Sequence, residues 1–141
     1  MRRITGAALA LLLNACRPDA APIVIENARS PASPPGAPVA AVYMSVESRQ
    51  DDVLLAARTP IAERAEMHMT IMDNDMMQMR PSPTVALTAG ETMEFAPGGL
   101  HFMLSNLRAR PAAGSSFPLN LTFQRAGDIE VQVRVHAPGE Q

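Results

Sequence analysis

Thirteen prolines and eight glycines divide this chain of 141 residues into short apolar runs. Proline breaks a helix interior and glycine weakens it, so this composition disfavours long helices and favours short strands. Hydrophobic residues make up 47% of the sequence and aromatic residues only 4%, which indicates an aliphatic core. We therefore expect many short strands packed around a single aliphatic core.

The apolar runs themselves have the alternation of half-buried strands. The clearest cases are residues 117–123 and 129–135, in which every second residue is apolar and which a turn at 126–128 connects. Further strands are expected at 23–27, 39–46, 53–57, 85–87, 92–95 and 101–104, with a single helical turn at 61–65. Short strands at turn spacing predict an all-β domain, an antiparallel β-sandwich or a small Greek-key barrel.

The N-terminus resembles an export signal. A basic start at residues 1–3 precedes an apolar segment at 4–13, which is too short to span a bilayer as a helix. The segment ends at Leu13-Asn14-Ala15-Cys16, which resembles a bacterial lipobox with the only cysteine at the lipidated position. We expect a periplasmic protein anchored to the membrane through Cys16; an ordinary secretory signal cleaved after Ala20 or Ala21 is the alternative.

These features divide the chain into four parts. Residues 1–16 form the signal, 17–22 a linker, 23–136 one folded domain and 137–141 a tail. A formal charge of -2 and a pI near 5.9 give no electrostatic reason to expect nucleic-acid binding. With Cys16 removed or acylated, the domain has no thiol, which excludes disulfides, a catalytic cysteine and a blue-copper site.

Methionines are concentrated in one segment. Six of the ten methionines fall within residues 66–79: Met67, Met69, Met72, Met76, Met77 and Met79. Asp73-Asn74-Asp75 has turn chemistry between two apolar runs, which predicts a β-hairpin. A turn at 73–74 places His68 opposite Met79, and a turn at 74–75 places the two diagonally. Both registers leave them on one face, because side chains alternate with period 2.

His101 and Met103 form a second candidate pair, since two residues on one strand that are two positions apart share a face. Together with His68 and Met79 they predict a four-ligand site of two imidazoles and two thioethers. Soft thioether and imidazole ligands select Cu(I) rather than Mg²⁺, Ca²⁺ or Mn²⁺. The competing interpretation is that the methionines only fill gaps in the core.

The spacing of these four residues, H-x10-M-x21-H-x-M, resembles the signature of the PCu(A)C copper chaperones. The resemblance extends through Pro35-Gly36, residues 41–43 and 51–54, Met79-Arg80-Pro81 and residues 97–107. Two departures are Arg29 and Pro31, where the family often has Trp-x-Arg, and Asn74-Asp75, where it often has Asn-Gly. The resemblance implies a cupredoxin-like β-barrel fold.

The resemblance also implies a role. By this resemblance, the protein is expected to carry Cu(I) and to deliver it toward the CuA centre of a haem–copper oxidase, with a Sco-type protein as a further partner. A periplasmic copper storage or tolerance protein is the alternative. A copper redox enzyme or electron carrier and a purely structural β-sandwich are rival classes. We expect no enzymatic activity, because the sequence offers no nucleophile–base pair, phosphate loop or carboxylate dyad.

Several residues near the proposed ligands need separate interpretations. We expect Met77 to pack beside the site, with a reserve ligand role as the alternative. The methionines at 67, 69 and 76 are expected on the opposite face, in the core or on a contact surface. Glu66 is a candidate hydrogen-bond acceptor for an imidazole, and Arg80 is expected to be a solvated charge beside the site. Asp51, Asp52 and His136 are not expected to form a catalytic or second copper site.

Overall fold

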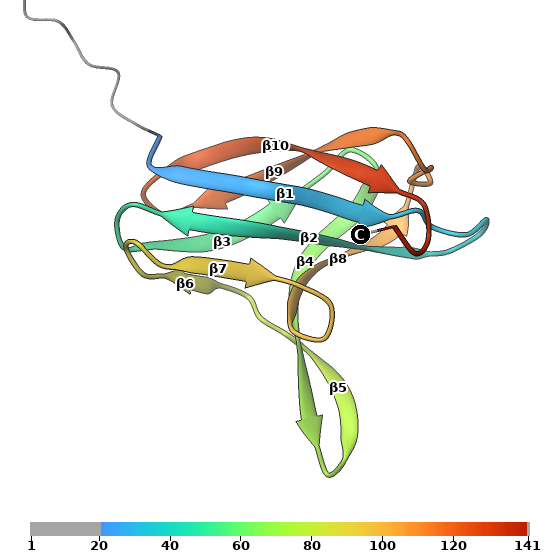
Figure 1. The fold of residues 1–141 in the computed structure, drawn as a ribbon, viewed down its shortest axis with the longest axis horizontal. Helices are drawn as coiled ribbons and strands as arrows, with labels where there is room; N and C mark the ends of the chain where they lie inside the picture. The colour runs from blue at the N-terminus through green and yellow to red at the C-terminus, as the bar shows by residue number, and fades with distance from the viewer. Residues whose placement is uncertain (1–20, 141) are drawn as a thin grey trace, which may run out of the picture.

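The computed structural model describes residues 21–140, which form ten strands and no helix. The strands are β1 (Ile23–Pro31), β2 (Val39–Ser48), β3 (Asp52–Arg58), β4 (Ala62–Asp73), β5 (Met76–Pro81), β6 (Val85–Leu87), β7 (Thr92–Phe95), β8 (Leu100–Leu107), β9 (Ser116–Phe123) and β10 (Gly127–His136). Figure 1 shows one body of strands, from which β5 and the end of β4 project as a hairpin.

The body is a closed barrel. Neighbouring strands follow the order β4-β8-β2-β1-β10-β9-β3, and an additional pairing of β3 with β4 at Ala57 and Ala65 completes the circuit. Every pairing is antiparallel except that of β1 with β10, which run parallel over residues 29–31 and 134–136. The all-β prediction of an antiparallel sandwich or Greek-key barrel is therefore confirmed, with this one parallel contact added.

The core contains aliphatic residues and a few aromatic ones. Strand β9 buries Phe117, Leu119, Leu121 and Phe123 and turns the residues between them outward, as the alternation predicted. Phe95 and Phe102 stack inside the barrel with ring centroids 4.5 Å apart. Burial of these side chains is the main source of stability, at roughly 25 cal/mol per Å² of apolar surface.

The expected strands agree with the observed ones in place, with ends that differ by a few residues. The helical turn expected at 61–65 is wrong, because Ala62 begins β4, which pairs with β8 from Ala62 onward and with β3 at Ala65. Those neighbours satisfy the backbone groups that a helical turn would have paired locally. The signal segment at 1–16 and most of the linker at 17–22 lie outside the described residues. Within residues 21–140, no helix is long and apolar enough to cross a membrane.

Asp51 and Asp52 hold turns together. The carboxylate of buried Asp52 accepts hydrogen bonds from the backbone N–H groups of Val53, Arg125 and Ala126 at 2.8–2.9 Å. Burial by itself raises the pKa of Asp52, but these three donors and the charge of Arg125 outweigh it and lower the pKa. Asp51 accepts one bond, from the backbone N–H of Ala89. Both carboxylates thus bind backbone N–H groups of loops and strand ends.

Candidate metal centre

The β4–β5 hairpin turns at Asn74-Asp75. Both residues have positive φ angles, 50° and 62°, which is the conformation of a type I′ turn. The register pairs Thr70 with Met79 and His68 with Pro81, so His68 and Met79 are diagonal neighbours on one face. Of the two registers that the sequence allowed, the structure adopts the second.

Replacing Asp75 with glycine is expected to stabilise the protein by about 0.5 kcal/mol, because glycine adopts a positive φ without steric cost and is favoured at this turn position. Asp75→Ala is expected to have the opposite sign, a loss of about 1 kcal/mol, since alanine is strained there. Denaturant unfolding of the two variants measures both effects. A stabilising alanine or a destabilising glycine would contradict the turn assignment.

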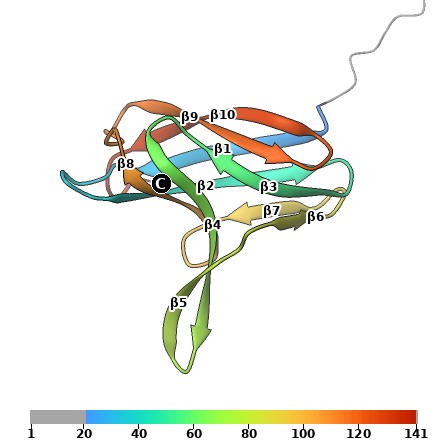
Figure 2. The same ribbon diagram turned by 180° about the vertical axis from the view of Figure 1, so that it is seen from behind.

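A second tight turn places His101 at the start of β8. Gly98 has a φ of 80°, a conformation that a side chain would strain, and the turn is closed by hydrogen bonds from Ala96 N–H to Leu100 O and from Gly99 N–H to Ala96 O. Leu100, Phe102 and Leu104 point into the barrel core, so His101 and Met103 point to its outer face. Met77 and Met79 of the hairpin and Pro97 and Gly98 of the turn line a cavity beside His101 and Met103. Figure 2 shows the hairpin from behind, projecting from the barrel next to the loop that joins β7 to β8.

His101 is the most informative residue of the site. It is only 4% exposed although it lies on an outward-facing strand position. Its Nδ1 lies 2.9 Å from the carbonyl oxygen of Gly99, and because a carbonyl only accepts, Nδ1 carries the ring proton. Nε2 is therefore the nitrogen with a free lone pair. This atom is buried and has no hydrogen-bond partner.

A cavity of about 240 Å³ opens next to His101. Both predicted sulfur ligands, Met79 and Met103, line its wall, as do Met77 from β5 and Tyr43 from β2. The remaining predicted ligand, His68, is the strand partner of His101 across β4 and β8, with ring centroids 6.1 Å apart. The tertiary structure thus brings all four predicted ligand residues to one face.

Two neighbours complete the surroundings. Glu66 lies on the same face as His68, and its Oε2 is 3.9 Å from His68 Nε2, which is beyond hydrogen-bond distance. Tyr43 stacks obliquely near His101 with centroids 6.5 Å apart, and the guanidinium of Arg29 lies 6.0 Å from the Tyr43 ring. The sequence analysis did not identify Tyr43 as part of the site. Its position two residues after Ala41, on the same outward face of β2, is the pattern that could have indicated it.

The donor set has a clear chemical preference. Across residues 21–140, no three His, Cys, Asp or Glu side chains come together, so the site has too few hard ligands to hold Mg²⁺ or Ca²⁺ in the usual way. Two neutral imidazoles and two neutral thioethers suit a soft monovalent ion. The unpartnered Nε2 of His101 fits such an ion, because a buried ring nitrogen without a partner is costly unless a ligand satisfies it.

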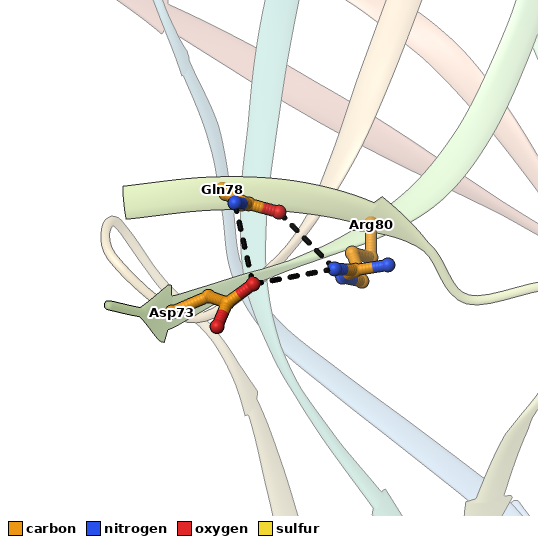
Figure 3. Close-up of polar contacts among 3 residues, drawn as sticks. All are labelled: Asp73, Gln78 and Arg80. Carbon is orange, nitrogen blue, oxygen red and sulfur yellow. Dashed lines mark hydrogen bonds and ion pairs between the residues drawn. The ribbon is translucent and has the colours of Figure 1, made fainter. Parts of the chain in front are cut away.

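Arg80 lies on the opposite face of the hairpin, whereas the sequence analysis expected it beside the site. Arg80 points away from the cavity, where its guanidinium lies 3.8 Å from the carboxylate of Asp73 and donates to the Gln78 side chain at 3.1 Å (Figure 3). On the neighbouring strand Arg80 pairs with Met69, whose side chain points to the face opposite to that of His68. Of the methionines expected on this face, Met67 is buried, and Met69 and Met76 are exposed.

His136 lies at the end of β10, next to β1, and does not line the cavity at His101. Its Nε2 is also buried without a partner, but it lines a separate hollow between β1 and β10 together with Arg29 and Arg134. Two guanidinium groups and no sulfur make that hollow unsuitable for a cation. That His136 does not form a second copper site stays a prediction.

Sequence comparison identifies relatives over most of the domain. The family described as "Putative lipoprotein LpqE-like" matches residues 23–135. A curated relative, "Putative lipoprotein Lxx21020" from Leifsonia xyli subsp. xyli (strain CTCB07), is 30% identical over 84 residues. That match covers 59% of this chain and 51% of the relative, so it spans about half the length of the curated protein.

Structural comparison finds copper-binding domains. The copper-bound PCuAC domain from PmoF2 matches with a TM-score of 0.70 and 23% identity over 83% of this chain and 94% of that domain. Apo-DR1885 from Deinococcus radiodurans matches with a TM-score of 0.65 and 24% identity over 99% of this chain and 95% of that one. CuI-DR1885 has a TM-score of 0.62 and 27% identity, with 83% and 79% covered. The cupredoxin-like fold expected from the sequence is confirmed.

Proposed function

The chain belongs to the family "Putative lipoprotein LpqE-like", and on that premise we propose that it is an exported copper chaperone of the PCu(A)C type. Its cargo is Cu(I), held by His68, Met79, His101 and Met103. The role is to bind and transfer the ion, not to catalyse a reaction.

One observation carries this proposal: the buried Nε2 of His101 has no partner and lies beside a cavity lined by Met79 and Met103. The Gly99 carbonyl orients the imidazole as carbonyls commonly orient metal-binding histidines, with the proton on the nitrogen away from the ligand. His136 also has a buried Nε2 without a partner, but only the Nε2 of His101 lies beside thioether sulfurs. The copper-bound state of the PmoF2 domain and of DR1885 supports the assignment.

The ligand set also accounts for the oxidation state and for release. Cu(II) prefers tetragonal sites of nitrogen and oxygen, whereas thioethers favour Cu(I). Neutral ligands hold Cu(I) less tightly than thiolates do, so an acceptor with cysteine ligands can withdraw the ion. Met79 is 58% exposed, which leaves the sulfur side of the site open to such an acceptor.

The receiving protein and the location follow from the same proposal. The acceptor is the CuA subunit of a haem–copper oxidase, with a Sco-type protein as a further partner. The chaperone works in the periplasm, tethered to the membrane through a lipid on Cys16 after removal of residues 1–15, and residues 17–22 link the anchor to the domain. Membership of a lipoprotein family supports the tether.

Anaerobic titration with Cu(I) against a chromophoric chelator tests the proposal. The parent is expected to bind one tight equivalent, and Met79→Leu to weaken that binding at least about tenfold, as loss of a ligand contact should. Met69→Leu is the matched control, because Met69 lies on the same hairpin but on its opposite face. A parent that fails to compete for Cu(I), or equal effects of the two substitutions, would refute the chaperone assignment.

A further inference from the structure

The two faces of the projecting hairpin carry different chemistry. On one face, Asp73, Gln78 and Arg80 satisfy one another in a small network (Figure 3). The other face carries, from the barrel outward, His68 and Thr70 on β4 and Met79 and Met77 on β5, followed by Met72. Beyond Thr70, every side chain on this second face up to the turn is a thioether.

Met72 and Met77 form the outermost pair. They lie directly opposite each other in the register, one pair before the pair that closes the turn. Cβ atoms of opposed residues on paired strands are about 5 Å apart, so two flexible methionine side chains there can bring both sulfurs to one ion. Their exposed fractions are 66% and 68%, among the highest of the large apolar side chains.

Met77 connects this outer pair with the inner site. It lines the same cavity as His101, Met79 and Met103, whereas Met72 does not. Sulfur atoms are thus available in sequence from the exposed tip, through Met77 and Met79, to the buried imidazole of His101. No cationic side chain lies on this face of the hairpin to repel a positive ion, since Arg80 is on the other face.

We propose that Met72 and Met77 form a second, weaker Cu(I) position at the tip of the hairpin, through which the ion enters and leaves the four-ligand site. The position is made of thioethers alone and takes soft monovalent ions. This inference rests on the proposed function, because it describes the path of the same cargo. Transfer is ligand exchange: the ion forms a bond to one sulfur before it loses a bond to another, and its oxidation state does not change.

The exposure of the pair has a physical consequence. Apolar side chains at a projecting tip gain nothing from burial in the apo-protein, so they contribute little to its folding. As sulfur ligands without charge they also bind weakly, which lets the ion move on. An intermediate step of this kind replaces a single large change of ligands by several small ones.

The test compares two double variants that remove equal numbers of exposed thioethers. Met72→Leu/Met77→Leu removes the outer pair, and Met69→Leu/Met76→Leu removes two methionines from the opposite face of the same hairpin. Leucine retains the volume and hydrophobicity, so both variants are expected to fold as the parent does. Each protein is titrated with Cu(I), and with Ag(I) as a redox-inert probe, while the methionine methyl resonances are followed by NMR.

The parent is expected to bind a second equivalent at least about tenfold more weakly than the first, with shifts at Met72 and Met77. Met72→Leu/Met77→Leu is expected to lose the second equivalent and to release Cu(I) to a chelator several-fold more slowly. Met72→Leu alone leaves the wall of the inner cavity unchanged, so it is expected to weaken the second equivalent and to keep the affinity of the first. The opposite-face variant is expected to match the parent in all three measurements.

The outcomes separate the two proposals. If the parent binds one equivalent tightly and Met72→Leu/Met77→Leu behaves as the parent does, the tip position is refuted and the chaperone stands. If the parent binds no Cu(I), the chaperone assignment itself fails. If both double variants lose the second equivalent, the weak binding is nonspecific and the tip position is again refuted.

Discussion

His101→Phe is expected to abolish tight Cu(I) binding, a loss of at least about 100-fold in affinity, while the apo-protein keeps its stability to within about 1 kcal/mol. Copper affinity falls because Nε2 of His101 is the metal-ligating nitrogen of the site that is buried and has no hydrogen-bond partner. Stability is retained because phenylalanine removes a buried polar atom that has no partner, which offsets the strain of a larger ring.

The loss of the Nδ1 hydrogen bond does not change this expectation. The Gly99 carbonyl that accepts it also accepts a hydrogen bond from the backbone N–H of Thr70 at 3.2 Å, so it remains satisfied in the variant. The measurements are the Cu(I) competition titration and denaturant unfolding of the metal-free protein. A purely structural histidine would give the reverse result: a large loss of stability with copper binding retained.

His136→Phe is the matched control. His136 also has a buried Nε2 without a partner and an Nδ1 near a backbone carbonyl, that of Ala137, but it lies between β1 and β10. The substitution is expected to change stability in a similar way and to leave Cu(I) binding untouched. Loss of copper binding in this variant would show that the assay reports general damage to the fold.

Asp52→Ala is expected to destabilise the protein by about 3 kcal/mol, because it leaves three partly buried backbone N–H groups without their acceptor. These groups belong to Val53 on β3 and to Arg125 and Ala126 in the turn between β9 and β10. The carboxylate therefore ties the start of one strand to a turn distant in sequence. Denaturant unfolding measures the effect, and a change under 1 kcal/mol would contradict the role. Asp51→Ala, which removes one exposed bond, serves as the control and is expected to cost less than about 1 kcal/mol.

The same carboxylate gives stability a pH dependence. Its folded-state pKa lies below the ordinary value of 3.8, so the folded state favours the ionised form. The stabilisation is fully present above the pKa of the unfolded chain and is lost as the pH falls from about 4 through the folded pKa. The parent should therefore lose more stability between pH 5 and pH 2.5, both rough bounds, than Asp52→Ala does. Equal pH profiles would mean that Asp52 is not the responsible group.

Local sequence patterns determined much of the fold. The alternation in residues 117–123 and 129–135 specified which side chains enter the core, because a strand turns successive residues to opposite faces whatever lies beside it. The same period placed His101 with Met103, and His68 with Met79 in both of the hairpin registers considered. Turn residues with special backbone freedom, such as Gly98, marked where strands end.

Patterns of this kind did not determine which strands would be neighbours. The parallel contact between β1 and β10 joins the two ends of the domain, and the contact between β3 and β4 closes the barrel. Both depend on the packing of the whole chain around one core. For the same reason the helical turn predicted at 61–65, a segment without a strong local pattern, is wrong, because residues 62–65 lie in β4.

The candidate site also depends partly on local sequence and partly on tertiary structure. The sequence by itself determined the four residues of the proposed ligand set and their soft chemistry, since residue type and spacing are local properties. Only the tertiary structure decided that His101 is buried at an outward-facing position, because Tyr43 and His68 on the two neighbouring strands lie beside its ring. It also decided which ring nitrogen is free, because the Gly99 carbonyl that binds the other nitrogen is placed by a turn whose geometry depends on β4 and β8 together.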